Sequence, residues 1–287
     1  MSKDTTDMNG KTCLVTGANS GIGKATAAGL AAMGATVVMV CRDAVKGETA
    51  LNEIITETGS QDVSVMIADL ASLKSIREFA ANFLDKHERL DVLINNAAIM
   101  PTSRTETSDG FETQFGVNHL APFLLTHLLL DLLKASAPSR IVNVSSTLHH
   151  KATLDLDDLQ YERNKYRAMQ AYGRSKLANI LFTYELARRL KGTGVTANCL
   201  HPGVVRTSLM RDLPFFLQPL LKIAGMMMLS PSGGARTSVH VATSPDLEGV
   251  TGEYFDKCAV TRSSSVSHDA ESGARLWEIS AELTHTG

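Results

Sequence analysis

The chain has 287 residues, of which 44% are hydrophobic and 20% charged, and its formal net charge at pH 7 is −2. This length and apolar content are enough to bury a core without disulfides or structural metals. The mixed charges give no electrostatic reason to expect a nucleic-acid partner. The four cysteines are widely spaced and form no CxxC pair, which is typical of reduced thiols in the cytoplasm and argues against a metal site.

No linker interrupts the chain, so we expect one domain over residues 1–287. It begins with a polar tail, 1–10, in which we see neither a signal-peptide core nor a membrane anchor. These features predict a cytoplasmic protein.

A strand, a glycine-rich turn and a helix are predicted first, over Lys11–Gly34. The apolar run Thr12–Val15 is too short for a helix and is stopped by Gly17, as in a strand that is buried on both faces. The glycines of the turn let the backbone bend sharply and let a ligand approach the main chain. The Ala-rich helix that starts near Gly21 presents free amides and the positive end of its dipole. This arrangement predicts a dinucleotide-phosphate site, the alternative being a glycine-rich loop without a ligand.

The second strand, Ala35–Val40, is followed by Cys41 and Arg42. An acidic residue at this place would bind the adenosine ribose hydroxyls of NAD. A guanidinium instead holds a 2′-phosphate through charge-assisted contacts, so Arg42 favours NADP(H) over NAD(H). The alternative for Arg42 is a solvated surface charge. Asp43 is predicted to cap the helix that begins near Ala44.

The third and fourth strands, Asp62–Ala68 and Asp91–Ile94, both run into polar residues. Asp69 follows the third strand, where it either accepts from an adenine amino group or caps its own turn, before a helix capped by Ser72. Small residues and amides follow the fourth strand at 95–98 and allow a cofactor to approach, although asparagine also suits any tight turn.

A long apolar helix is predicted over Phe111–Ala135. It contains Asn118, whose apolar neighbours indicate burial. Because a buried amide needs partners, Asn118 is either a candidate site residue or an ordinary polar group.

The fifth strand, Arg140–Val144, ends at two adjacent serines, where open parallel sheets place their ligands. After an irregular stretch at 149–169, the helix Ala171–Leu190 carries Tyr172 and Lys176 one turn apart on one face. The sixth strand, Val195–Leu200, leads to a Pro-Gly turn. This alternation of strands and helices predicts an α/β fold with a doubly wound parallel sheet and helices on both faces.

The segment Leu213–Leu229 is the most apolar outside the strands, but two prolines, a glycine and a lysine argue against a transmembrane helix. We expect it, within 205–231, to cover a binding cleft. Membrane-surface contact or a homo-oligomer interface are the alternatives. A last amphipathic helix is predicted over Ala274–Leu283.

Four motifs, in this order, resemble those of the short-chain dehydrogenase/reductase family, and the resemblance covers nearly the whole chain. They are a TGxxxGxG turn at 16–23, Asn95-Asn96-Ala97-Ala98 in the place of NNAG, a YxxxK motif at 172–176, and Pro202-Gly203. Finer features resemble the retinol dehydrogenase branch and the related WW-domain-containing oxidoreductases. These features include Cys41-Arg42-Asp43, Val117–Leu120 and the wide gap from Ser146 to Tyr172.

The resemblance implies a Rossmann-like fold and an NADP(H)-dependent oxidoreductase that interconverts an apolar carbonyl, such as a retinoid, steroid or lipid aldehyde, and its alcohol. The inserted segment, 151–167, would rim the substrate cleft. The cofactor residues implied are Gly17, Asn19, Ser20, Gly21, Ile22, Gly23, Arg42, Asp69, Leu70, Asn95, Asn96, Ala97, Tyr172, Lys176, Pro202, Gly203, Val205 and Thr207.

The catalytic residues implied are Asn118, Ser146, Tyr172 and Lys176. Tyr172 would be the acid/base, and Lys176 would favour its phenolate and bind the nicotinamide ribose. Ser146, with Ser145 as the alternative, would orient the substrate oxygen, and Asn118 would hold a water that passes protons to Lys176. A scaffold or redox sensor that binds NADP without catalysis is the competing hypothesis, since a fold does not fix an activity.

Overall fold

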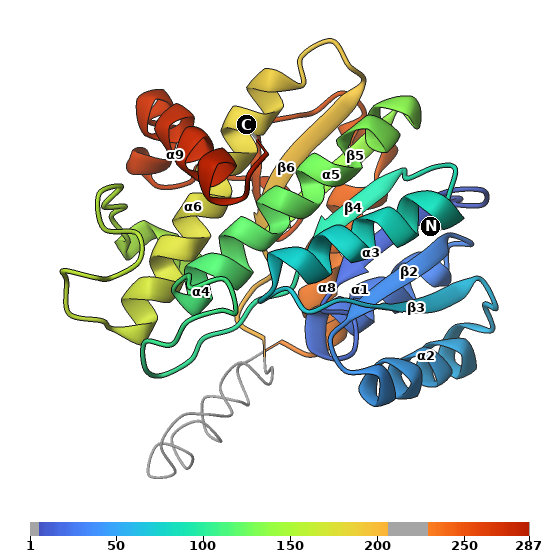
Figure 1. Cartoon of the computed structure of the whole chain (residues 1–287). Coiled ribbons are helices and arrows are strands. Elements are labelled where there is room, and N and C mark those ends of the chain that lie inside the picture. Colours follow the sequence, from blue (N-terminus) through green and yellow to red (C-terminus); the bar gives the residue numbers. More distant parts are fainter. Residues whose placement is uncertain (1–5, 206–228, 287) are drawn as a thin grey trace.

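The computed structural model of the chain describes residues 6–205 and 229–286. Their eight strands form one sheet in the order β3-β2-β1-β4-β5-β6-β7-β8 (Figure 1). Strands β1 to β7 are parallel, and β8 is antiparallel to β7. The strands are β1 Thr12–Thr16, β2 Thr36–Cys41, β3 Val63–Ile67, β4 Val92–Asn95, β5 Ser139–Val144, β6 Val195–His201, β7 Tyr254–Asp256 and β8 Ala259–Val260.

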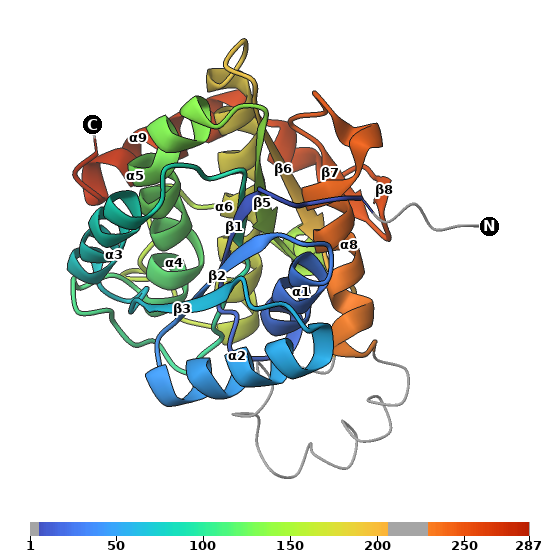
Figure 2. The ribbon, with the colours of Figure 1, turned by 90° about the vertical axis from the view of Figure 1, so that its right-hand side faces the viewer.

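Helices cover both faces of this sheet (Figure 2). Helices α1, α2 and α8 pack on one face, and α3, α5 and α6 pack on the other, where α9 lies against α6. The doubly wound α/β fold is therefore confirmed. The helices are α1 Gly21–Ala31, α2 Ala44–Thr58, α3 Leu73–Lys86, α4 Thr113–Phe115, α5 Ala121–Ala135, α6 Ala168–Arg189, α8 Pro231–Thr243 and α9 Ala270–Leu283.

The short apolar runs form strands because both sheet faces are covered. Along β1, Leu14 joins the core under α3 and α5, whereas Cys13 and Val15 join the core under α1 and α8. All three side chains are fully buried. Burial also raises the pKa of the Cys13 thiol, which is free, like the other three cysteines. Successive side chains thus enter opposite cores, which explains the absence of polar alternation in the strand.

Two helix starts have the predicted caps. The Asp43 carboxylate accepts from the Lys46 amide at the start of α2, and the Ser72 hydroxyl accepts from the Ser75 amide at the start of α3. Both side chains satisfy amides that the helix itself leaves free.

The helix predicted over Phe111–Ala135 differs in its first part. It begins at Thr113, and Gly116–Leu120 is π-helical before α5 continues. Such π segments are frequent at functional sites, and Asn118 lies in the middle of this one.

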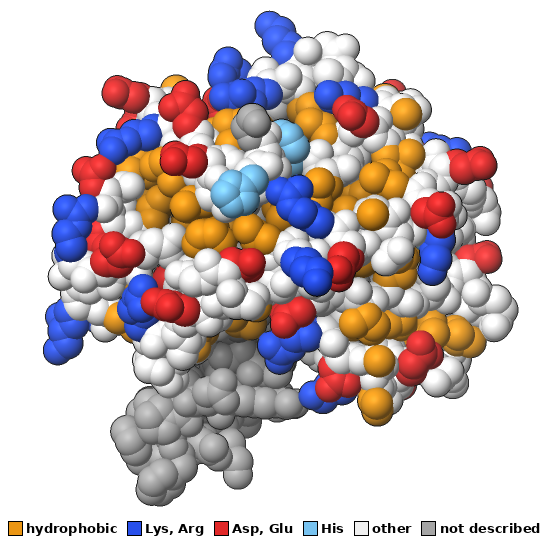
Figure 3. Space-filling model, viewed as in Figure 1, with side chains coloured by type: hydrophobic (Ala, Val, Ile, Leu, Met, Phe, Trp, Pro, Cys, Tyr) orange, Lys and Arg blue, Asp and Glu red, His pale blue; other side chains and the backbone are white. Residues whose placement is uncertain are grey.

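Among the described residues, only Thr113–Ala135 is a helical stretch long and apolar enough to cross a membrane, and 72% of its most apolar window is buried inside the protein. It is a core helix that packs against the sheet. The predicted cover segment lies outside the described residues except at its two ends. Lys, Arg, Asp and Glu side chains alternate over the face shown in Figure 3 without a continuous patch of one sign.

Candidate active site

Most of the predicted site residues lie just after the end of a strand, whereas Asn118, Tyr172 and Lys176 lie in helical segments. The glycine turn follows β1, Arg42 follows β2, Asn96 follows β4, Ser146 follows β5 and Pro202 follows β6. Because β1 to β6 are parallel, their carboxyl ends meet at one edge of the sheet, which is the edge that binds ligands in open α/β folds.

The glycine turn is shaped to receive a phosphate. Gly17 and Gly21 have φ values of +67° and +56°, and a Cβ on Gly23 would lie 2.3 Å from the Gly17 carbonyl oxygen. Ser20, the residue before α1, does not cap the helix with its side chain, and within the described part of the chain no acceptor meets the amides of 19–22. This cradle of free amides at a helix start fits an anionic ligand such as a dinucleotide pyrophosphate.

Replacing Gly23 by alanine is expected to destabilise the fold by about 1–3 kcal/mol, the usual cost of overpacking, and to weaken cofactor binding, because the new methyl group would push the Gly17 carbonyl aside. The matched control is Gly273→Ala in α9, where the nearest atom to the new Cβ is 3.7 Å away. Thermal unfolding and NADPH titration of both variants provide the measurement. Equal behaviour of the two would contradict this role of Gly23.

The exit of β4 is fastened to the exit of β1. The Thr16 hydroxyl accepts from the amides of Asn96 and Ala97, and the Asn96 side chain donates to the Thr16 carbonyl at 2.8 Å. Ala97 touches the place where a Gly17 side chain would be. These contacts hold the second and third residues of the Asn-Asn-Ala-Ala stretch beside the glycine turn.

The Asn95 side chain lies elsewhere, and a contact between Asn95 and the cofactor stays a prediction. It is buried, and its amide donates to Thr126 and, at 2.8 Å, to Asn143 of β5. As the last residue of β4, it points into the core, because neighbouring residues of a strand face opposite ways. Its part is to join β4 to β5 and α5.

The residues that follow β2 and β3 are accessible at the same edge. Arg42 is exposed and has no carboxylate partner in the described part of the chain. The Asp69 carboxylate accepts from the Ala71 amide, so it caps its own turn, which is one of the two predicted roles. Leu70 packs partly on the core beside α3. Cys41 is buried, with its pKa raised to about 11 by desolvation, and offers no acid for a ribose.

The two serines after β5 differ in exposure and in partners. Ser145 is buried, and its hydroxyl donates to the Lys176 carbonyl at 2.8 Å. Ser146 is partly exposed, and its oxygen accepts from the Leu148 amide at 3.3 Å, so its own proton stays free to donate. The geometry therefore favours Ser146 over Ser145 as the donor to a substrate oxygen.

Tyr172 and Lys176 lie side by side on α6, with the Lys176 Nζ 5.5 Å from the centre of the tyrosine ring. Nζ donates to the Val144 carbonyl of β5 at 2.9 Å, which ties the pair to the strand that carries Ser146. Both side chains are buried. Desolvation lowers the pKa of Lys176 to about 7 and raises the pKa of Tyr172.

These pKa shifts favour the neutral form of each group. Tyr172 thus keeps its proton, as a proton donor must before it acts. Once the proton leaves, the phenolate would favour the ammonium form of Lys176, because opposite charges this close stabilise each other in a buried site.

Asn118 braces the site from the π-helical segment. Its side chain binds the backbone of Ile99 in both directions, at 2.8 and 3.0 Å, and donates to Ser175 Oγ at 3.1 Å. The backbone carbonyl of Asn118 accepts from the side-chain amide of Asn179 on α6. Among the described residues no hydrogen bond joins Asn118 to Lys176, and the bridging water remains a prediction.

The exit of β6 is brought to the glycine turn by α8. Gly203 has a φ of +89°, as its place in a turn requires. A Cβ on Gly234 of α8 would lie 2.4 Å from Val205 and 3.2 Å from Ile22, so both predicted cofactor residues pack at this one helix position. Thr207 lies outside the described residues.

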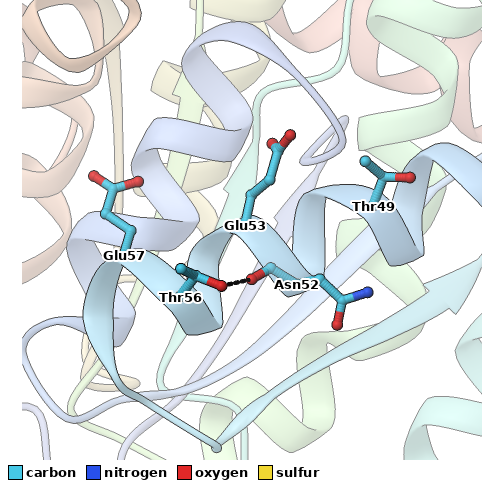
Figure 4. A pocket seen from close by; sticks show the side chains of 5 residues that line it. All are labelled: Thr49, Asn52, Glu53, Thr56 and Glu57. Carbon is cyan, nitrogen blue, oxygen red and sulfur yellow. Dashed lines mark hydrogen bonds between the residues drawn. The ribbon is translucent and has the colours of Figure 1, made fainter.

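Two hollows in the described surface lie away from this edge. One, of about 480 Å³, is lined only by exposed α2 side chains such as Asn52 and Glu53 (Figure 4). The other, of about 930 Å³, surrounds Asp91 and Arg140 at the amino ends of β4 and β5. Neither is lined by any of the predicted site residues, so neither is the candidate active site.

Comparison with known proteins decides the family. The sequence profile of the short chain dehydrogenase family matches residues 11–214, which is most of the chain. The chain belongs to this family. It is 50% identical over 279 residues to human "Retinol dehydrogenase 13", covering 96% of this chain and 84% of that protein. It is also 50% identical to mouse "Retinol dehydrogenase 14", covering 95% and 85%.

Solved structures share the fold of this chain. An uncharacterised Mycobacterium paratuberculosis protein superposes with a TM-score of 0.81 at 37% identity, covering 99% of this chain and 96% of that one. The Pseudomonas aeruginosa "RhlG/NADP active-site complex" does so with a TM-score of 0.71 at 26% identity, covering 89% and 97%. This short-chain dehydrogenase is therefore an oxidoreductase that uses a nicotinamide cofactor, and the predicted branch is confirmed.

Proposed function

We propose that this short-chain dehydrogenase uses NADP(H) to interconvert an apolar aldehyde or ketone and its alcohol. The observation that carries the proposal is the convergence of Ser146, Tyr172 and Lys176. Two hydrogen bonds join the end of β5, which carries Ser146, to Lys176: the Ser145 hydroxyl donates to the Lys176 carbonyl, and Lys176 Nζ donates to the Val144 carbonyl. The names of the retinol dehydrogenases that are about half identical to this chain support a retinoid-like substrate. Steroid and lipid-derived carbonyls belong to the same apolar class.

Each site residue has a part in the reduction. When bound, NADPH supplies the hydride that reaches the carbonyl carbon. The Ser146 hydroxyl donates a hydrogen bond to the carbonyl oxygen and orients it, and Tyr172 gives that oxygen its proton. Lys176 balances the charge left on Tyr172, and the reverse steps oxidise the alcohol.

The cofactor would bind along the carboxyl edge of the sheet. The free amides of the glycine turn fit its pyrophosphate, and Arg42, which is exposed after β2, would supply the cation for a 2′-phosphate. The NADP-bound structural relative supports this choice. The proposed contacts come from Gly17, Asn19, Ser20, Gly21, Ile22, Gly23, Arg42, Asp69, Leu70, Asn96, Ala97, Tyr172, Lys176, Pro202, Gly203, Val205 and Thr207.

Oxidation of NADPH, followed against a panel of all-trans-retinal, steroid ketones and long-chain aldehydes, tests the proposal. We expect turnover with at least one apolar carbonyl. Tight NADPH binding without turnover of any of them would instead support the scaffold hypothesis.

Replacing Arg42 by aspartate is expected to weaken NADPH binding by about 10-fold or more, since a hydrogen bond to a charged group contributes about 1.5–3 kcal/mol. NADH binding should change little or improve. Arg262→Asp makes the same charge change at another exposed position and should leave both affinities as they are. Titration calorimetry measures them, and equal NADPH affinity of wild type and Arg42→Asp would refute this contact.

A further inference from the structure

The turn that carries Ser146 is held by a buried histidine. His149 lies in the short 3₁₀ segment after β5 and has no exposed surface. Its Nδ1 is 2.6 Å from the Ser146 carbonyl oxygen, which also accepts from the His149 amide. His149 therefore closes the turn on Ser146 with both its backbone and its ring.

The second ring nitrogen ties this turn to a distant part of the chain. Nε2 accepts from the Ser264 amide at 3.1 Å. Because a carbonyl can only accept and an amide can only donate, Nδ1 carries the hydrogen and the ring is neutral. Burial lowers the pKa of His149 to about 4, so this state holds at physiological pH.

The far end of this link is anchored to the catalytic helix. Ser263, next to Ser264, is 2.7 Å from the hydroxyl of Tyr184 on α6, and its hydroxyl also contacts Ser267. The His149 ring packs beside Tyr254 of β7, with ring centres 5.0 Å apart. Ser146 is thus placed relative to α6 from two sides, by Ser145 on Lys176 and by His149 through Ser264.

We propose that His149 is a positioning residue for the Ser146 hydroxyl: its ring fixes the turn so that this hydroxyl faces the proton donor on α6. This inference rests on the proposed function, and on Ser146 as the donor to the substrate oxygen. His149 itself does not touch the reacting atoms. Its neighbour His150 is exposed, and its side chain forms no hydrogen bond in the described part of the chain. The His150 ring lies beside that of His149, with ring centres 4.0 Å apart, so His150 is a matched control for the loss of a histidine ring at this turn.

The test measures turnover of all-trans-retinal by NADPH, with NADPH affinity and thermal stability measured alongside. His149→Ala is expected to lower turnover by about 10- to 100-fold, the scale of a small misplacement of a catalytic group, and to leave NADPH affinity unchanged. His149→Asn keeps a donor for the Ser146 carbonyl and should recover most of the loss. His149→Gln keeps an acceptor for the Ser264 amide only and should behave like alanine. His150→Ala should match wild type.

Combination with Ser146→Ala separates positioning from a general structural role. If His149 acts through Ser146, His149→Ala should cost almost nothing further once Ser146 is alanine. A loss that multiplies with that of Ser146→Ala would overturn the inference, and so would normal turnover of His149→Ala. Should the alanine variant not fold, the same comparison with His149→Gln decides. If Ser146→Ala alone keeps full turnover, the proposed role of Ser146 is wrong, and the inference falls with it.

Discussion

Tyr172→Phe is expected to lower turnover by about 100-fold or more, the usual scale of general acid–base catalysis, while NADPH affinity stays near that of wild type. The substitution removes only the hydroxyl. The ring keeps its place beside Lys176, and Lys176 keeps its bond to Val144. Proton transfer to the substrate oxygen is lost, and the fold and the cofactor site are kept.

Steady-state kinetics and NADPH titration measure this effect. Tyr161→Phe is the matched control, because the Tyr161 hydroxyl is buried without a partner among the described residues and lies on the inserted segment. It should keep normal turnover. If Tyr172→Phe does the same, another residue carries the proton, and the assignment of Tyr172 is wrong.

Lys176→Met is expected to impair both turnover and cofactor binding. Methionine fills most of the lysine volume, so the core is kept, but the amino group beside Tyr172 and its bond to Val144 are lost. We expect turnover to fall by about 100-fold or more, and NADPH affinity by about 10-fold, since the ammonium is proposed to bind the cofactor ribose as well.

The same assays check this pair of effects. Lys191→Met, at an exposed lysine just beyond α6, controls for the loss of charge and should match wild type in both. Loss of turnover with unchanged NADPH affinity would show that Lys176 does not bind the cofactor ribose. Unchanged turnover would remove Lys176 from the chemistry.

The sheet and its edge were predictable because their signals are local. Each of the six predicted strands is a short apolar run, and each runs into residues with a recognisable chemistry, such as the glycines after β1 or the serines after β5. The spacing of Tyr172 and Lys176 is itself a helix-face signal. These local patterns are sufficient because both faces of the sheet are buried, which makes the strands apolar, and because the strand ends meet at one edge.

Other elements could not be predicted, because distant contacts decide them. No element was predicted for residues 231–262, where α8, β7 and β8 lie. Helix α8 contains two glycines and several Ser and Thr residues, which disfavour a helix, yet Gly234 is required where α8 meets Val205 and Ile22. The orientation of Asn95 could not be predicted either, because the sequence does not show which of the adjacent side chains, Asn95 or Asn96, faces the core.

His149 was missed for a related reason. Two adjacent histidines look like loop residues in sequence, and only the fold shows that the first is buried against Ser264, far away in the chain. Its nearness to the predicted serine, three positions along, was the available signal. This spacing points to His149 only when the structure shows its ring bonded to the Ser146 carbonyl.

The most direct test of the central claim, that this enzyme moves a hydride between NADPH and an apolar carbonyl, follows the hydride itself. All-trans-retinal is incubated with the protein and with NADPH that carries deuterium at C4 of the nicotinamide, using each C4 epimer in turn, and the product is examined by mass spectrometry. We predict retinol labelled at its alcohol carbon from one epimer only, and no such product with Tyr172→Phe over the same time. Bound NADPH with no deuterium in retinol, or in the alcohol of any other apolar carbonyl tried, would contradict the account.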